Sequence, residues 1–194
     1  MHILFIGYGK TSQRVAKQLF TLGHQITTIS RSPKTDPDMT HLLQDIQQLD
    51  LSQIQPVDAV YVLLAPSRNT VLSSVEAYQQ TYVDSVQPIV TALKDHPVKR
   101  IIVLSSTRVY GENAGECIDD ETVPKPSDVQ GQLLLQMEHL WQQAYPEQWQ
   151  TILSANQQKA PLWLRVNQQQ ISPDAYLKAL DEAGIAASQP FAYL

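Results

Sequence analysis

The sequence predicts an α/β protein with three layers, in which helices cover both faces of a parallel five-stranded sheet of order 3-2-1-4-5. Three observations support this. Short apolar runs such as His2–Ile6 are typical of strands buried on both faces. Amphipathic segments alternate with these runs, and repeated strand–helix alternation is typical of doubly wound sheets. A glycine turn joins the first strand to the first helix.

The first unit comprises a strand, a helix and a second strand. The strand at 2–6 precedes a helix that should end near Gly23, a common residue at helix ends. The β-branched segment 25–30 is the second strand. The helix is predicted from apolar residues at helical spacing, namely Val15, Ala16, Leu19 and Phe20.

The middle of the chain continues this alternation. Residues 31–45 are polar and should hold a loop and a short helix, and 46–51 is the expected third strand. A stronger apolar run at 59–64 is the fourth strand. A long helix should cover 69–94, with a bend at Pro88. The fifth strand is then expected at 100–104.

The last part forms a short α/β extension. We expect a helix up to Ala144, a second helix over 146–156 and a strand at 161–166. Residues 162–166 could pair as a sixth strand, and a separate flexible tail is the alternative. The run Ser172-Pro173-Asp174 is a strong helix start, and that helix should end at Gly184. We therefore expect one domain over 1–143 and a second part over 144–194.

Composition excludes several functional classes. The 194 residues carry a net charge of -5, which argues against non-specific nucleic-acid binding, so RNA is not an expected partner. No apolar run approaches the length of a membrane span, and we expect a cytoplasmic protein. The single cysteine excludes a disulfide framework, and no metal site is expected. The histidines lack ligand spacing: His2, His24, His41, His96 and His139.

The glycine turn is the main candidate binding site. The pattern G-x-G-x-x-S follows the first strand and opens the first helix, as in Rossmann-like dinucleotide sites. A pyrophosphate would lie on the helix N-terminus, where free N–H groups favour an anion. A purely structural turn is the alternative. The candidate cofactor-binding residues of the turn are Gly7, Gly9, Lys10, Thr11 and Ser12.

The end of the second strand bears on cofactor choice. An NAD site usually places an acidic residue there, whereas this chain has Arg31, with Lys34 nearby. A guanidinium suits a 2′-phosphate, so the sequence favours NADP over NAD. An ordinary solvated arginine is the alternative.

Residues 1–140 resemble an extended or atypical short-chain dehydrogenase/reductase of the NAD-dependent epimerase/dehydratase branch. The segments that carry the resemblance are the glycine turn, Asp50-Leu51, Leu64-Ala65-Pro66, Ser105-Ser-Thr-Arg-Val-Tyr-Gly111 and the acidic loop 115–126. The resemblance implies that Asp50 contacts the adenine, that Ala65 and Pro66 line the cofactor, and that Ser106 orients a substrate. It also implies a packing role for Tyr110, with an acid–base role as the alternative.

One departure from this family concerns catalysis. Its members use a Tyr-x-x-x-Lys pair on the helix after the fifth strand, and the matching positions here are Val129 and Leu133. Neither side chain can carry a proton. We therefore expect an NAD(P)-binding protein with weak or absent dehydrogenase or epimerase activity. The substrate and the oligomeric state remain open, although the expected 69–94 helix is of the kind that pairs in homodimers of such enzymes.

Residues 145–185 resemble a different family, the Sun/Fmu-type 16S rRNA cytosine-C5 methyltransferases, in the region ahead of their catalytic domain. The segments concerned are 145–150, 155–158, 161–167 and 180–185. The resemblance implies a join between a truncated Rossmann protein and a methyltransferase fragment. Two alternatives to a weak reductase follow: an RNA-binding fragment, and a non-enzymatic nucleotide-binding domain.

Overall fold

The computed structural model describes residues 1–67, 71–111, 115, 117–119, 121–146 and 166–188. The chain divides into two compact units, Met1–Gln157 and Gln158–Leu194. Within the described residues, no helix is both long and apolar enough to cross a lipid bilayer.

The first unit is built on a five-stranded sheet of order β3-β2-β1-β4-β5, which confirms the predicted order. Every neighbouring pair is parallel. The central strand, β1, is buried along its whole length because it is paired on both sides and covered on both faces. The strands are β1 (His2–Ile6), β2 (Gln25–Ser30), β3 (Thr40–Leu43), β4 (Ala59–Val62) and β5 (Arg100–Val103).

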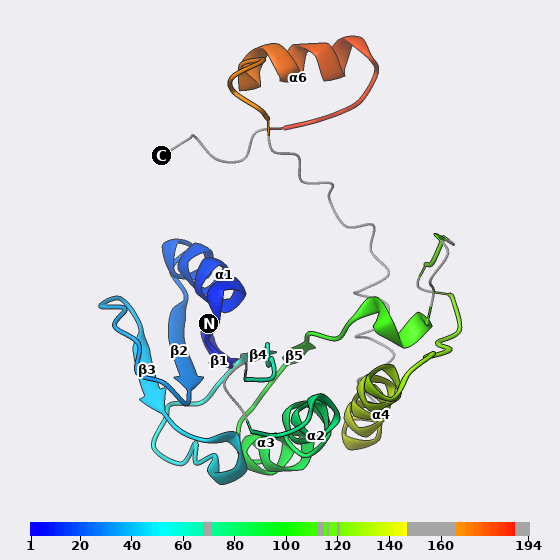
Figure 1. Cartoon of the computed structure of the whole chain (residues 1–194). Coiled ribbons are helices and arrows are strands. Elements are labelled where there is room, and N and C mark those ends of the chain that lie inside the picture. The colour runs from blue at the N-terminus through cyan, green and yellow to red at the C-terminus, as the bar shows by residue number, and fades with distance from the viewer. Residues whose placement is uncertain (68–70, 112–114, 116, 120, 147–165, 189–194) are drawn as a thin grey trace. The chain divides into compact units, whose positions relative to one another are not determined.

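Helices lie on both faces of the sheet (Figure 1). Helix α1 (Lys10–Thr21) covers one face, where Ile3 and Phe5 of β1 share a cluster with Ala16. On the other face, Leu4 and Ile6 belong to the larger core cluster. This alternation is the two-residue period of a strand. The second face is covered by α2 (Ser74–Tyr78), α3 (Val86–Leu93) and α4 (Val129–Ala144).

The predicted position of the third strand is wrong. Strand β3 occupies Thr40–Leu43, in register with Thr27–Ser30 of β2. The expected strand at 46–51 instead begins with a 3-10 turn, η1 (Ile46–Gln48). The cause is local: the Asp45 carboxylate accepts a hydrogen bond from the backbone N–H of Gln47, and such a bond competes with strand pairing.

The expected long helix is interrupted, but not at Pro88. A π-helical turn, η2 (Gln79–Val83), separates α2 from α3. Pro88 lies in the first turn of α3, where a missing N–H breaks no hydrogen bond within the helix. The interruption of the helix therefore lies upstream of Pro88, the residue at which a bend was predicted.

Helix α4 ends at Ala144 as predicted, and α6 (Pro173–Glu182) begins at the predicted start signal. Helix α4 begins after Asp128, whose carboxylate accepts from the N–H of Gly131 at 2.7 Å. In the second unit, α6 begins after Ser172, whose hydroxyl accepts from the N–H of Ala175 at 3.2 Å. Gly184 follows it with φ of 72°. The helix expected at 146–156 and the sixth strand expected at 162–166 lie outside the described residues, apart from a residue at one end of each.

Candidate functional site

The first glycine of the turn after β1 is required by the backbone. Gly7 has φ of 91°, in the region that favours glycine. A Cβ atom there would lie 2.3 Å from the carbonyl oxygen of Leu63, a residue that follows β4. The Ser12 hydroxyl donates to the Gly7 carbonyl oxygen at 2.6 Å, so the small third residue of the pattern closes the turn.

The second glycine has a different role. Gly9 is the N-cap of α1 and its backbone is extended, so no strain demands glycine there. An added Cβ would meet no atom within 4 Å. No side chain caps the helix start, so first-turn N–H groups of α1 can bind an anion. The absence of a side chain at Gly9 leaves this helix start open to a close approach along the backbone.

A cavity of about 440 Å³ opens beside this turn, at the carboxyl ends of β1, β2 and β4. Its volume lies within the usual range for small-molecule and cofactor sites. Ligands in open α/β sheets bind at this edge. The described residues that line it are Gly7, Tyr8, Gly9, Ile29, Ser30, Arg31, Ser32, Lys34, Gln44, Asp45, Ile46, Gln47, Leu63, Leu64, Ala65, Ser67, Gln80, Thr81 and Ser85.

Two cations, Arg31 and Lys34, line the β2 side of this cavity. Among the described residues, neither forms an ion pair with a carboxylate. Their charge is therefore available to an anionic ligand. The neighbouring carboxylate of Asp36 is engaged elsewhere, because it accepts a hydrogen bond from Tyr8.

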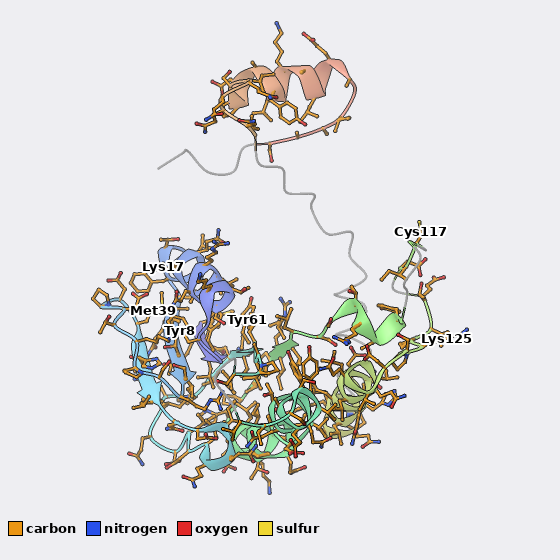
Figure 2. All side chains as sticks on the ribbon, in the orientation of Figure 1. Tyr8, Lys17, Met39, Tyr61, Cys117 and Lys125 are labelled. Atoms are coloured by element: carbon orange, nitrogen blue, oxygen red, sulfur yellow. The ribbon has the colours of Figure 1, made fainter. Side chains whose placement is uncertain are left out.

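Tyr8, the residue between the two glycines, ties the turn to the loop after β2. It is 3% exposed, and its hydroxyl lies 3.3 Å from Oδ2 of Asp36 and 3.2 Å from Sδ of Met39. Figure 2 shows Tyr8 and Met39 side by side beneath α1. Burial, together with the Asp36 carboxylate, raises the pKa of Tyr8 to about 12.

The predicted cofactor residues divide into two groups. Gly7, Gly9, Arg31 and Ala65 line the cavity. The others do not line it: Lys10 and Thr11 are exposed on α1, Ser12 is buried behind the turn, and Pro66 follows Ala65.

Asp50 is not among the residues that line the cavity. Hydrogen bonds from the side chain and from the backbone N–H of Ser52 lower the pKa of its carboxylate. The backbone of Asp50 exchanges two hydrogen bonds with the Gln44 side chain. The acidic residue that lines the cavity after β3 is Asp45, followed by Ile46. This pair follows the observed β3, as Asp50 and Leu51 lie at the end of the strand expected at 46–51.

The interrupted helix also contributes cavity residues that the sequence pattern did not indicate. Gln80 and Thr81, from the π turn, and Ser85 line the cavity. A π turn cannot be distinguished from an ordinary helix by hydrophobic spacing.

Ser106 lies at a second cavity of about 440 Å³, beyond the end of β5. The 3-10 turn η3 (Thr107–Tyr110) starts there, and the Ser106 hydroxyl accepts from the N–H of Arg108 at 3.3 Å. Arg108 and Asp128 both line this cavity and form an ion pair, with Nη2 to Oδ2 at 2.7 Å. The described residues that line it are Tyr78, Ser106, Thr107, Arg108, Gly111, Ile118, Ser127 and Asp128.

Helix α4 lacks the proton-transfer pair in any register, because it contains no tyrosine and no lysine. Val129 is 50% exposed and Leu133 is buried in the core. Tyr110 packs against the larger core cluster and does not line either cavity. The ionisable group of α4 near the end of β5 is Glu138, which accepts a hydrogen bond from Ser105 and whose pKa burial raises.

No group of three or more His, Cys, Asp or Glu side chains in the described part of the chain could hold a metal ion. Cys117 is an exposed free thiol in the loop after η3 (Figure 2).

Comparison with protein families gives two matches on different parts of the chain. The NAD(P)H-binding family model matches residues 7–128, which include the whole first cavity. The model of the RsmF/B-like methyltransferase ferredoxin-like domain matches residues 137–193.

The curated relatives match a short segment. Ribosomal RNA small subunit methyltransferase B of Escherichia fergusonii is 59% identical over 44 residues, which is 23% of this chain and 10% of that protein. The protein of the same name from Escherichia coli O1:K1 gives the same values. The chain thus spans about a tenth of the length of these relatives.

Solved structures match the sheet domain. UDP-glucuronic acid 4-epimerase from Bacillus cereus in complex with NAD has a TM-score of 0.63 at 22% identity, over 76% of this chain and 53% of that one. MoeE5 in complex with UDP-glucose and NAD has a TM-score of 0.64 at 22% identity, over 74% and 49%. The chain spans about half the length of these structures, and at this identity the likeness shows the Rossmann-like fold.

Proposed function

The chain belongs to the NAD(P)H-binding family, and on that premise we propose that its first cavity binds NADP in preference to NAD. The single observation that carries the preference is the location of Arg31 and Lys34. Both line the cavity where β2 ends, and no described carboxylate neutralises either. The end of β2 is where this fold distinguishes a ribose hydroxyl from a 2′-phosphate.

The rest of the cavity accommodates the other parts of a dinucleotide. The pyrophosphate would lie over Gly9, where the N–H groups of α1 favour an anion. The adenine would contact Asp45 and Ile46, because this pair follows the observed β3. Ala65 would lie along the ribose, beside the end of β4. Each part of the ligand then has a partner from a different strand end.

Calorimetric titration with NADP and NAD tests this proposal. We expect NADP to bind more tightly, and Arg31→Ala to weaken NADP binding about tenfold, the equivalent of one charge-assisted contact of about 1.4 kcal/mol. NAD binding should change less than twofold. Arg14→Ala is the matched control, because Arg14 is an exposed arginine on α1 outside the cavity.

Three results would count against the proposal. No heat with either cofactor at millimolar concentration would remove the cofactor assignment altogether. Tighter binding of NAD than of NADP would contradict the proposal that Arg31 favours NADP. Equal losses in Arg31→Ala and Arg14→Ala would show that only overall charge matters.

We also propose that dinucleotide binding is accompanied by little or no dehydrogenase or epimerase turnover. The support is the composition of α4, which contains neither member of the Tyr-x-x-x-Lys pair. Ser106 can orient a carbonyl group by hydrogen bonding, but a serine hydroxyl is a poor proton donor near neutral pH.

The match to the methyltransferase relatives favours a second candidate, RNA binding by residues 137–193. The charges of α6 argue against RNA binding, because acidic residues outnumber basic ones on this helix. The basic residue is Lys178, and the acidic residues are Asp174, Asp181 and Glu182. Retention on an immobilised 16S rRNA fragment at low and at high salt distinguishes the candidates. Retention that falls steeply with salt would favour RNA binding, and we expect none.

A further inference from the structure

A chain of hydrogen bonds connects the buried part of β2 to the turn that carries Arg31. His41, on β3, lies between the two. Its Nδ1 is 2.8 Å from Oγ1 of Thr28, and its Nε2 is 3.4 Å from Oγ of Ser30. The Ser30 hydroxyl in turn donates to the carbonyl oxygen of Ser32 at 2.7 Å.

The Ser32 carbonyl sets the direction of the outer bond. It can only accept, so the Ser30 hydroxyl donates to it, and the Ser30 oxygen is left to face Nε2 of His41. At the inner end the Thr28 hydroxyl has two neighbours, Nδ1 of His41 at 2.8 Å and the carbonyl oxygen of Thr40 at 3.4 Å. The imidazole therefore contacts a hydroxyl of β2 through each of its two nitrogen atoms.

The inner end of this chain is rigid and the outer end lies at the ligand cavity. Thr28 is 0% exposed and belongs to β2, which is paired on both sides. Ser30, Arg31 and Ser32 all line the cavity. The bond from Ser30 to Ser32 spans Arg31, so it restricts the backbone from which the guanidinium projects. His41 contacts the hydroxyl that makes this bond, and so can orient it.

We propose that His41 is a positioning residue that sets the selectivity of the cavity for the 2′-phosphate of NADP. The inference rests on the proposed function and adds the residue that determines its specificity. Where the backbone around Arg31 is already restricted, less conformational entropy is lost when the guanidinium binds a phosphate. NAD lacks that phosphate, so its affinity should not depend on how the Arg31 turn is held.

Two conservative variants separate the two ends of the imidazole. The side-chain amide of His41→Asn occupies the position of Nδ1 and can keep the bond to Thr28, but it cannot reach Ser30. The longer His41→Gln places its amide near Nε2 and can keep the bond to Ser30. His139→Asn is the control, because His139 is an exposed histidine on α4 outside both cavities.

The measurement is the Kd ratio of NAD to NADP for the whole chain, with the thermal midpoint recorded for each variant. His41→Asn should lower the ratio about fivefold through the NADP affinity alone, and His41→Gln should keep it within twofold of the wild type. Ser30→Ala removes the central hydroxyl without altering β3 and should reproduce the loss. It keeps the proposal testable if a His41 variant fails to fold.

Each result supports or overturns a specific claim. A ratio unchanged in both His41→Asn and Ser30→Ala would overturn the role of His41 and leave NADP binding intact. Equal weakening of both cofactors would also overturn it, because that pattern indicates general damage to the site. A wild-type chain that binds neither cofactor, or that prefers NAD, would overturn the proposed function and this inference with it.

Discussion

The phenol of Tyr8 and the carboxylate of Asp36 lie 3.3 Å apart and join the glycine turn to the loop after β2. The tyrosine is buried while the aspartate lies in the loop beside Arg31 and Lys34. The pair therefore links the glycine turn to the loop that carries Arg31 and Lys34.

This pair predicts a specific dependence of stability on alkaline pH. The pKa of Tyr8 rises from 10 to about 12 in the folded protein, so the unfolded chain releases this proton first. The contribution of the protonated Tyr8 to the unfolding free energy is complete below pH 10. It is lost as the pH rises from 10 to about 12. Tyr8→Phe should flatten the fall in unfolding free energy over this range, and should cost about 1 kcal/mol near pH 7 through the lost hydrogen bonds.

Urea denaturation at pH 7 to 11 measures this effect. Tyr61→Phe is the control, because the Tyr61 ring stacks on Phe5 in the same cluster at 4.8 Å between centroids. Some alkaline dependence should remain in Tyr8→Phe, since burial also raises the pKa of Tyr82 and of Tyr145. Identical slopes for Tyr8→Phe and the wild type would contradict the assignment.

Substitutions of the two glycines of the turn should have different effects on stability. Gly7→Ala imposes a Cβ atom 2.3 Å from a backbone oxygen at a positive φ. The conformation alone costs about 1–3 kcal/mol, so the thermal midpoint should fall clearly. Gly9→Ala meets no protein atom and should leave the midpoint nearly unchanged.

Cofactor titration measures the effect of Gly9→Ala, which thermal stability should not reveal. Gly9→Ala should weaken NADP binding by about tenfold or more, because its methyl group occupies the space where a phosphate approaches the helix. A stable Gly9→Ala protein with unchanged affinity would show that no phosphate lies over this glycine.

The Asp128 carboxylate has two partners, and two variants separate them. It pairs with Arg108 and caps α4 through Gly131, and these bonds lower its pKa below 3.8. Stability from this group is present above pH 3.8 and is lost as the pH falls through the lowered pKa. Asp128→Asn keeps the cap but loses the charge, so its acid dependence should be shallower.

Asp128→Ala loses the ion pair and the cap together. Its thermal midpoint at pH 7 should therefore lie below that of Asp128→Asn. Thermal scans from pH 3 to pH 7 check both expectations. Equal midpoints for the two variants would mean that the cap on α4 contributes nothing.

Turnover with sugar-nucleotide and carbonyl substrates and NADPH should stay below about one per second, near the low end of typical enzymes. General acid–base catalysis supplies about 10² to 10⁴ in rate, and α4 offers neither group of the usual pair. Faster turnover that survives Ser106→Ala and Tyr110→Phe would mean that another residue does the chemistry. Loss through Tyr110→Phe alone would contradict a packing role for that tyrosine.

The sequence predicted the sheet better than the site. Strands β1 and β2 were placed to the residue, because a buried apolar run and a β-branched run are both strong local signals. Strand β3 was missed because Thr40–Leu43 is short and only partly buried, so its pattern is weak. Its position depends on pairing with β2, a non-local interaction.

That error carried over to the site. Asp50, expected near the end of the misplaced strand, does not line the cavity, whereas Gly7, Gly9 and Arg31 follow well-placed strands and do line it. Neither the bonds of His41 nor the π turn could be predicted, because both depend on the packing of separate segments. The NADP preference, homodimer formation and the domain boundary near residue 143 stay predictions.

The central position of β1 determines how amide hydrogens should exchange with solvent. Its amides lie in a strand that is buried throughout and flanked by β2 and β4, so they can exchange only when the whole sheet opens. In the described part of the chain β5 pairs with β4 alone, and Ile102 is 38% exposed. The free energy of opening should therefore fall from β1 to β5, so deuterium should enter this sheet first at β5 and last at its centre.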